Sequence, residues 1–316
     1  MLGGRGDAGW SVRAGGRGGA NRMMLAPECV APTGCVLGNG PVWSETEGFL
    51  WWVDVKRAKL HRYNPRTGNT RRYDLPLRAS AIALYEGSFL MVGDREIGVY
   101  DPSTEVYDTL LGVETEPEGN RTNDGGVAPD GSFWFGTMDD QEREASGNYY
   151  RFGTDKALSQ LRLPSVLSTN TMQFSPDGKT FYTCDSAEQE ILAFDFDQAT
   201  GALTGRRIFA STYEFGGFPY GSAVDSEGCL WTSLWGASRI VRYTPDGKVD
   251  RVIILAAPRP TGIAFGGPDY RTMFITTARA GMSFPQLDAR PLSGSLFAVQ
   301  VDIPGLPARE FGRAIG

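Results

Sequence analysis

The amino-acid sequence predicts an all-β protein that folds as a six-bladed β-propeller. A Gly- or Asp-centred turn followed by an apolar strand recurs along the chain, further strand pairs separate these repeats, and there is no convincing long helix. The steps between successive turn glycines are 39, 44, 47 and 50 residues, as expected for one four-stranded blade per repeat. These glycines are Gly48, Gly87, Gly131, Gly178 and Gly228.

The repeats can be followed in order along the chain. The predicted apolar strands are residues 49–54, 88–94, 132–137, 179–185, 229–234 and 273–277. The predicted strand pairs between them are 60–63 with 70–75, 97–100 with 106–111, 191–196 with 207–210, and 240–243 with 249–255. A closing strand at 295–301 is expected to pair near the N-terminus, because a closed ring leaves no open sheet edge.

Composition divides the chain into two parts. Residues 1–24 are rich in Gly and Arg and predict a disordered tail, whereas residues 25–316 form the propeller domain. The 41 glycines and 19 prolines suit a chain with many turns. No export signal is evident, so we expect a cytoplasmic protein.

The charge and hydropathy of the chain limit its partners. A net charge of -6 argues against nucleic-acid binding, because no basic face is available for phosphates. No apolar run is long enough to span a membrane. We therefore expect a small-molecule substrate, and a monomer or a weak homo-oligomer.

His61 is the single histidine, so any Ser-His-Asp triad, Cys-His dyad or multi-histidine metal site would require it. It lies in an alternating strand at 59–63, which predicts a surface position. Cys184 and Cys229 lie in apolar strands and are expected to be buried. A disulfide between Cys29 and Cys35 is not expected in a reducing compartment.

Candidate site residues precede the strands that line the predicted channel, where loops from several blades converge. Asn39 lies between two glycines, and similar polar segments occur at 121–126, 168–172 and 218–222. A single Asn beside Gly is usually a turn residue, but several at corresponding places exceed what turns require. Arg121 and Asp124 either pair with each other or together bind a polyhydroxylated substrate or a carboxylate.

From about residue 35 to residue 301 the chain resembles the SMP-30/gluconolactonase/LRE-like family, which includes regucalcin, gluconolactonases and bacterial sugar lactonases. The matching stretches are residues 37–43, 121–125, 175–182, 224–231 and 261–279. They cover nearly the whole predicted domain in the right order. The resemblance implies a six-bladed propeller and a lactonase with one divalent metal ion (Ca, Mg, Mn, Zn or Fe).

The resemblance also implies roles for individual residues. Arg121, Asn123 and Asp124 match the substrate-binding residues, and Asn170 matches the Asn among the metal ligands. The Glu and Asp that complete the family's ligand set are replaced by Asn39 and Tyr220. Hard cations depend on carboxylate oxygens, so we expect weak or absent metal binding, with Asn39 and Asn170 as weak or vestigial ligands.

Three functions are compatible with this pattern. The first is a lactonase-type hydrolase with an altered metal site, acting on a small oxygenated substrate. The second is a metal-independent biosynthetic enzyme such as a cyclase, with Tyr220 as acid or hydrogen-bond donor, Asp124 as base and Arg121 as an electrostatic clamp. The third is a non-catalytic binder of small molecules.

Overall fold

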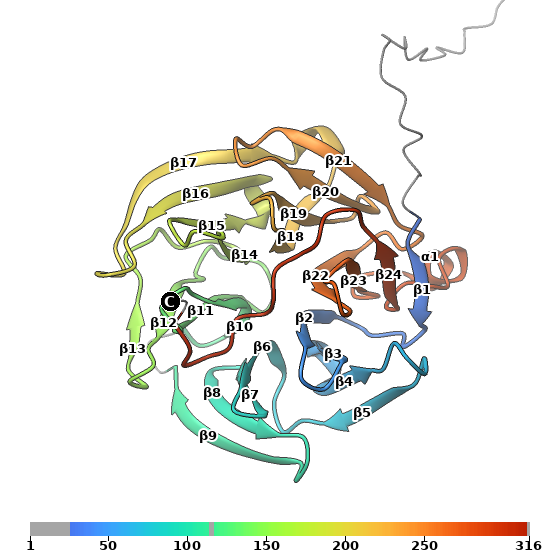
Figure 1. The fold of residues 1–316 in the computed structure, drawn as a ribbon, viewed down its shortest axis with the longest axis horizontal. Coiled ribbons are helices and arrows are strands. Elements are labelled where there is room, and N and C mark those ends of the chain that lie inside the picture. The colour runs from blue at the N-terminus through green and yellow to red at the C-terminus, as the bar shows by residue number, and fades with distance from the viewer. Residues whose placement is uncertain (1–25, 114–116, 315–316) are drawn as a thin grey trace, which may run out of the picture.

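The computed structural model describes residues 26–113 and 117–314. In this part of the chain six four-stranded antiparallel sheets surround a central axis, which confirms the predicted six-bladed propeller (Figure 1). The predicted tail at residues 1–24 lies outside the described residues.

The first three blades each consist of four consecutive strands, which follow one another outwards from the channel. Blade 1 contains β2 (Gly38–Ser44), β3 (Phe49–Asp54), β4 (Lys59–Tyr63) and β5 (Thr70–Asp74). Blade 2 contains β6 (Ala79–Tyr85), β7 (Ser88–Gly93), β8 (Glu96–Asp101) and β9 (Val106–Gly112). Blade 3 contains β10 (Asn120–Val127), β11 (Phe133–Asp139), β12 (Tyr149–Phe152) and β13 (Leu158–Gln160).

The second half of the ring repeats this arrangement. Blade 4 contains β14 (Thr169–Phe174), β15 (Thr180–Asp185), β16 (Glu190–Phe196) and β17 (Leu203–Ser211). Blade 5 contains β18 (Phe218–Val224), β19 (Leu230–Trp235), β20 (Arg239–Tyr243) and β21 (Val249–Ile254). Blade 6 contains β22 (Pro260–Gly266), β23 (Thr272–Thr277), β24 (Leu296–Gln300) and β1 (Glu28–Ala31).

Helical segments are short. The α-helix α1 (Phe284–Ala289) lies in the connection between β23 and β24, and a capping box of Ser283 and Gln286 begins it. Three one-turn 3-10 helices complete the described elements, at Val55–Arg57, Ser186–Glu188 and Tyr213–Phe215.

Strand β1 closes the ring. It pairs antiparallel with β24, so that Glu28 lies opposite Ala298. This confirms that the predicted strand near residue 295 pairs with the N-terminal part of the propeller. Because the outer strand of blade 6 comes from the start of the chain, this sheet joins the two ends of the domain and leaves no gap in the ring.

The apolar strands predicted after each turn form the second strand of their blade, not the innermost one. Their large side chains fill the space between neighbouring blades: Trp51, Trp134 and Trp231 are each 0% exposed. The innermost strands contain fewer apolar residues, because one side of each faces the channel. The candidate polar residues lie within these innermost strands, which corrects the expectation that they occupy loops.

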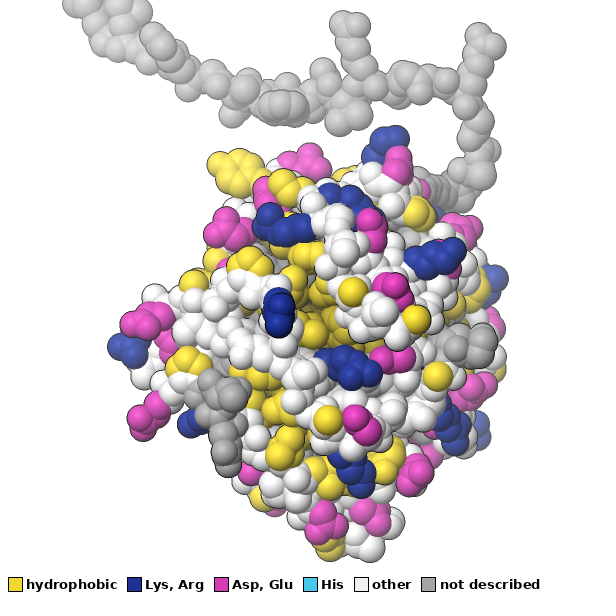
Figure 2. Space-filling view, turned by 90° about the vertical axis from the view of Figure 1, so that its left-hand side faces the viewer, with side chains coloured by type: hydrophobic (Ala, Val, Ile, Leu, Met, Phe, Trp, Pro, Cys, Tyr) yellow, Lys and Arg dark blue, Asp and Glu magenta, His cyan; other side chains and the backbone are white. Residues whose placement is uncertain are grey.

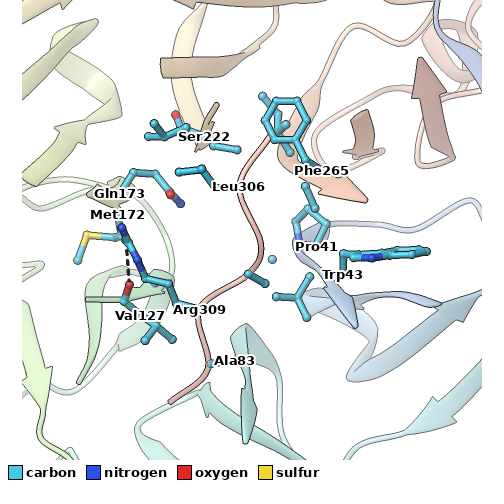
Figure 3. A pocket seen from close by; sticks show the side chains of 18 of the residues that line it. Pro41, Trp43, Ala83, Val127, Met172, Gln173, Ser222, Phe265, Leu306 and Arg309 are labelled. Atoms are coloured by element: carbon cyan, nitrogen blue, oxygen red, sulfur yellow. Dashed lines mark hydrogen bonds between the residues drawn. The ribbon is translucent and has the colours of Figure 1, made fainter. Parts of the chain in front are cut away.

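A C-terminal segment at 303–311 crosses one end of the channel (Figure 1). Backbone hydrogen bonds from Ser226 to Pro304 and from Phe311 to Leu84 attach it to two blades. It lies against a cavity of about 160 Å³, whose lining includes Pro41, Trp43, Val127 and Arg309 (Figure 3). Most of the residues that line this cavity are apolar, although Gln173, Ser222 and Arg309 are polar.

The surface shown in Figure 2 carries both signs of charge in alternation, with no large area of one sign. Among the described residues, no helix combines the length and the apolar character that crossing a membrane requires.

Candidate functional site

Each innermost strand is interrupted by a β-bulge or irregularity in its first half. In blade 1 the pairing shifts between Asn39 and Val42, and in blade 4 it shifts between Asn170 and Gln173. Corresponding shifts occur in β6, β10, β18 and β22. A bulge bends a strand and redirects its side chains. Six bulges at one level thus bring polar side chains together around the channel.

Hydrogen bonds between blades show that these bulges lie at the same end of the channel. In each case a side chain of one inner strand donates to a backbone carbonyl of the next. The bonds run from Asn39 to Ser80, from Asn123 to Thr169, from Thr171 to Tyr220 and from Thr261 to Gly38. The candidate residues from four blades therefore lie at the same end of the channel.

Arg121 is held in one orientation by its neighbours. Its side chain is 3% exposed; Nε donates to Asp140 at 2.7 Å, and Nη1 donates to the carbonyl of Thr122 and to Asn123 Oδ1 at 2.9 Å. The ion-pair partner is thus Asp140, and the suggested pairing with Asp124 is wrong. Within the described part of the chain Nη2 makes no bond, so it is free to bind a ligand oxygen.

Asp140 joins three cations at this end of the channel. Lys56 and Arg78 each lie 2.7 Å from its carboxylate, in addition to Arg121. Partial burial opposes ionisation, but hydrogen bonds from Lys56, Arg78 and Arg121 outweigh it and hold the pKa of Asp140 well below its usual range. Asp140 therefore stays ionised and holds Arg121 in place across the physiological pH range.

Asp124 is buried, and among the described residues it has no ion-pair partner. Its Oδ1 accepts a hydrogen bond from the backbone N–H of Gly125 at 2.9 Å, and Oδ2 accepts a longer one from Met172 at 3.4 Å. Burial raises the pKa of Asp124 to about 6, although these backbone hydrogen bonds lower it in part. A carboxyl group with this pKa can take up and release a proton near neutral pH.

This burial predicts a pH-dependent stability. The unfolded chain has the ordinary Asp pKa of about 3.9, so the folded state binds the proton more tightly and loses stability as pH rises from about 4 to 6. Replacing Asp124→Asn should raise the free energy of unfolding by on the order of 2 kcal/mol at pH 8 and hardly at all at pH 4. Urea unfolding at both pH values measures the effect. The exposed Asp288→Asn is the matched control, and an equal effect at both pH values would contradict the assignment.

Asn123 and Asn170 form a pair across blades 3 and 4. Asn170 is 0% exposed and its Nδ2 donates to Ser186 Oγ at 2.8 Å. Its Oδ1 lies 3.4 Å from Asn123 Nδ2. These bonds fix the amide orientations, so that the side chains are preorganised and not merely turn residues.

Thr171, next to Asn170, has a backbone conformation that L-residues rarely adopt. Its φ is +59°, whereas the corresponding position after Asn39 is Gly40, with φ +54°. A β-branched residue with positive φ is strained, and such strain is concentrated at functional sites. Its hydroxyl compensates in part by hydrogen bonding to the Tyr220 carbonyl at 2.6 Å and to Ser222.

Tyr220 is half-buried, and its ring stacks on Trp235 with centroids 5.5 Å apart. Burial raises the pKa of its phenol above the usual value; the charge of Arg121 lowers it and that of Asp124 raises it. Tyr220 is therefore close enough to Arg121 and Asp124 for their charges to act on it. Its phenol stays protonated at physiological pH and is available as a hydrogen-bond donor.

Asn39 occupies the blade 1 position of the same ring. It is 1% exposed, and its Nδ2 donates to the Ser80 carbonyl at 3.0 Å. Its Oδ1 has no partner within the described residues. The amide therefore offers one neutral oxygen to a ligand.

The expected surface position of His61 is wrong. The side chain is 6% exposed, stacks on Trp52, and its Nε2 lies 3.7 Å from Cys35 Sγ. Burial lowers its pKa to about 4. The predicted strand is present as β4, but its burial does not alternate, because the connection between β1 and β2 covers His61. Cys184 and Cys229 are buried as predicted, and the described structure has no disulfide.

Sequence reasoning missed Asp140, Thr171 and Trp235. Asp140 follows the apolar strand β11, and an acidic residue at such a strand end was a visible signal. The positive φ of Thr171 gave no signal in the sequence, because threonine is not a residue type associated with this backbone conformation. Trp235 was visible only as the end of an apolar strand.

A family model for the SMP-30/gluconolactonase/LRE-like region matches residues 37–279. The chain belongs to this family. The match contains all six inner strands and every candidate residue, so the family resemblance seen in the sequence is confirmed.

Named relatives extend over the same region. The chain is 34% identical to 6-deoxy-6-sulfogluconolactonase of Pseudomonas putida over 279 residues, covering 88% of this chain and 96% of the relative. It is 34% identical to L-arabinolactonase of Azospirillum brasilense over 288 residues, covering 89% and 94%. Among solved structures, the calcium-binding protein regucalcin of Agrobacterium tumefaciens matches with a TM-score of 0.86 and 28% identity, covering 91% of this chain and 97% of that one.

Proposed function

We propose that this protein is a lactonase-type hydrolase that opens a small sugar-lactone-like ring with little or no help from a divalent metal ion. Family membership and the two relatives named as sugar lactonases support the reaction class. The observation that carries the proposal is the buried carboxyl of Asp124, whose pKa is raised to about 6 and whose charge, like that of Arg121, acts on the phenol of Tyr220.

The donor set at the family's metal position fits a tightly bound divalent cation poorly. It consists of the amide oxygens of Asn39 and Asn170 and the protonated phenol of Tyr220. Calcium and magnesium sites need carboxylates, because these supply the charge that offsets dehydration of the ion. The nearby carboxyl of Asp124 is the proposed base, so it is not counted among the metal ligands. The proposed mechanism therefore has no step that involves a metal ion.

The remaining groups are sufficient for hydrolysis. Asp124 in its ionised form takes a proton from water while the water oxygen attacks the lactone carbonyl carbon. The phenol of Tyr220 donates a hydrogen bond to the carbonyl oxygen as it gains negative charge. The ring C–O bond then breaks, and the ring oxygen receives the proton held by Asp124. The free Nη2 of Arg121 donates to a substrate oxygen, and the remaining lone pair of Asn123 Oδ1 accepts from a substrate hydroxyl.

The phenol of Tyr220 can be tested alone. Tyr220→Phe should lower kcat roughly 10²-fold with little change in KM, since one oxyanion donor is lost while the ring still stacks on Trp235. Steady-state kinetics on the best lactone give both constants. The exposed Tyr213→Phe removes the same hydroxyl elsewhere and should leave kcat unchanged. A kcat of Tyr220→Phe equal to the parent's would exclude this role.

The proposal itself is tested with a panel of sugar lactones, assayed for acid release with and without EDTA. We expect turnover of at least one lactone, with less than a twofold loss after chelation. If chelation abolishes turnover and calcium or manganese restores it, the protein is a lactonase that depends on its metal. If no lactone is opened, hydrolysis is the wrong reaction.

The neutral ligand positions also favour a second candidate, a metal-independent cyclase or related biosynthetic enzyme in the same pocket. Tyr220, Asp124 and Arg121 would keep their roles as hydrogen-bond donor, base and clamp. In that case sugar lactones would bind without being hydrolysed, and Asp124→Asn would leave their affinity intact. A non-catalytic binder would also bind sugar lactones without hydrolysing them. Product formation from candidate natural-product precursors would distinguish the cyclase from the binder.

A further inference from the structure

A second cluster of metal-ligating side chains lies outside the channel, at the place where the ring closes. Residues 32–37 lead from β1 in blade 6 to β2 in blade 1. Cys35, on this connection, receives a backbone hydrogen bond at its carbonyl from Arg279 and donates one from its N–H to Gly294 at 2.8 Å. Its side chain points to blade 1, where it meets Asp54 and His61.

The three side chains present one donor atom each. Cys35 Sγ, an Asp54 carboxylate oxygen and a His61 ring nitrogen all lie within 4.8 Å of one another. Their side chains are nearly inaccessible to solvent, at 1%, 1% and 6% exposed. Burial of three such donors together is unusual, and it unites the single histidine of the chain with one of its four cysteines.

The donors are held in place by their surroundings. Asp54 accepts backbone hydrogen bonds from Val36 at 2.9 Å and Leu37 at 3.0 Å, so its carboxylate is fixed to the connection that carries Cys35. His61 is fixed by stacking on Trp52, with centroids 5.0 Å apart and an angle of 15° between the rings. Each carboxylate oxygen keeps a second lone pair for a ligand.

The spacing suits a tetrahedral metal ion. Zinc–sulfur and zinc–nitrogen bonds of about 2.3 and 2.0–2.1 Å place sulfur and nitrogen roughly 3.6 Å apart at a tetrahedral angle. The distance from Cys35 Sγ to His61 Nε2 is 3.7 Å. Thr33 Oγ1, 3.4 Å from the same sulfur, or a water molecule can supply the fourth donor.

The chemistry of the donors selects the class of metal. A thiolate and a carboxylate together neutralise a divalent cation. Sulfur and imidazole favour zinc and similar transition metals over calcium and magnesium, which prefer oxygen. This set differs from the all-oxygen donors of the channel site, so the two sites can be distinguished by whether sulfur binds the ion.

We propose that Cys35, Asp54 and His61 form a structural site for a zinc-like divalent transition metal, which ties the ring-closing connection to blade 1. The ion acts where this connection meets blade 1 and adds to the hydrogen bonds from Val36 and Leu37 to Asp54 that already join them. Its binding is independent of the proposed lactonase activity.

Cobalt titration of the metal-free, reduced protein tests the proposal. The parent should develop a thiolate-to-cobalt charge-transfer band at one equivalent, and zinc should displace it. Cys35→Ser should abolish the band, and His61→Gln should weaken cobalt binding at least tenfold. Cys229→Ser and Cys29→Ser remove thiols elsewhere and should keep the full band. A parent without the band, or a Cys35→Ser variant that retains it, would overturn the assignment.

A measurement on the unaltered chain covers the case in which Cys35→Ser fails to fold. X-ray absorption at the zinc edge should show one sulfur neighbour at about 2.3 Å with nitrogen and oxygen neighbours near 2.0–2.2 Å. Zinc should also raise the Tm of the parent and have a smaller effect on His61→Gln. A zinc spectrum without sulfur would place the ion elsewhere and contradict the proposal.

Discussion

Asp124→Asn should reduce kcat/KM for the best lactone by about 10²–10⁴-fold, because the variant has no group that accepts a proton from water. The shape of the side chain is kept, and its oxygen can still accept the hydrogen bond from Gly125. The loss should therefore appear in kcat more than in KM. Steady-state kinetics over a range of pH provide the measurement.

The pH dependence distinguishes a base from a merely structural carboxylate. In the parent, activity should rise with pH through about 6, as the buried carboxyl of Asp124 ionises. This rise should be absent from the residual activity of Asp124→Asn and unchanged in the surface control Asp288→Asn. A variant that keeps activity within threefold, or keeps the same pH profile, would show that another group is the base.

The double replacement Asn39→Glu with Tyr220→Asp should create a divalent-metal site where the parent binds weakly or not at all. Two carboxylates would then join Asn170 at the end of the channel. If each contributes a few kcal/mol, affinity for calcium or manganese should rise by at least two orders of magnitude. Isothermal titration calorimetry measures this directly, and the Tm of the double variant should become metal-dependent.

A matched control separates charge from shape. Asn39→Gln with Tyr220→Asn introduces side chains of similar size without negative charge and should gain no metal affinity. An equal gain in metal affinity in both double variants would mean that access of the ion to the site, and not the charge of the ligands, limits metal binding. A parent that already binds calcium tightly would show that amide and phenol oxygens suffice, and the proposed metal independence would then be withdrawn.

The same substitution that removes the proposed base should also stabilise the protein. Burying Asp124 as an ion lowers the free energy of unfolding. We infer that this loss of stability is tolerated because the proposed reaction needs a carboxylate in a site shielded from water. An inactive Asp124→Asn variant that unfolds at higher urea concentration at pH 8 would agree with both expectations. These two results come from independent measurements on one protein.

The fold was largely predictable, because each blade is signalled by a short local sequence pattern. Turns such as Pro129-Asp130-Gly131 and the apolar strands after them recur at blade spacing, so counting turns counts blades. The exception is the position of those strands within each blade: they are second from the channel. Every strand that is buried between blades has apolar side chains of this kind. The sequence alone therefore does not show which strand of a blade lies next to the channel.

The contacts of the candidate site residues were not predictable from the sequence. The segments that contain Asn39, Asn170 and Tyr220 were chosen because they occupy matching places in different blades, and the family resemblance then singled out the individual residues. The partner of Arg121 was not identified, because both Asp124 and Asp140 are near in sequence and only the bulge in β10 decides which one faces the guanidinium. His61 was misplaced for a similar reason: its neighbour Cys35 is distant in sequence and belongs to the connection between two blades.

The pairing of β1 with β24 has a consequence for how the molecule is made. Glu28 of β1 pairs with Ala298 of β24 in blade 6. Strand β1 therefore has no partner until almost the whole domain has been translated. At roughly 5–20 residues per second, this delay lasts on the order of tens of seconds. During that interval five blades can assemble, yet the sixth offers an unfinished edge to any chain nearby. A holdase that covers this edge until β24 is complete should therefore raise the yield of folded protein.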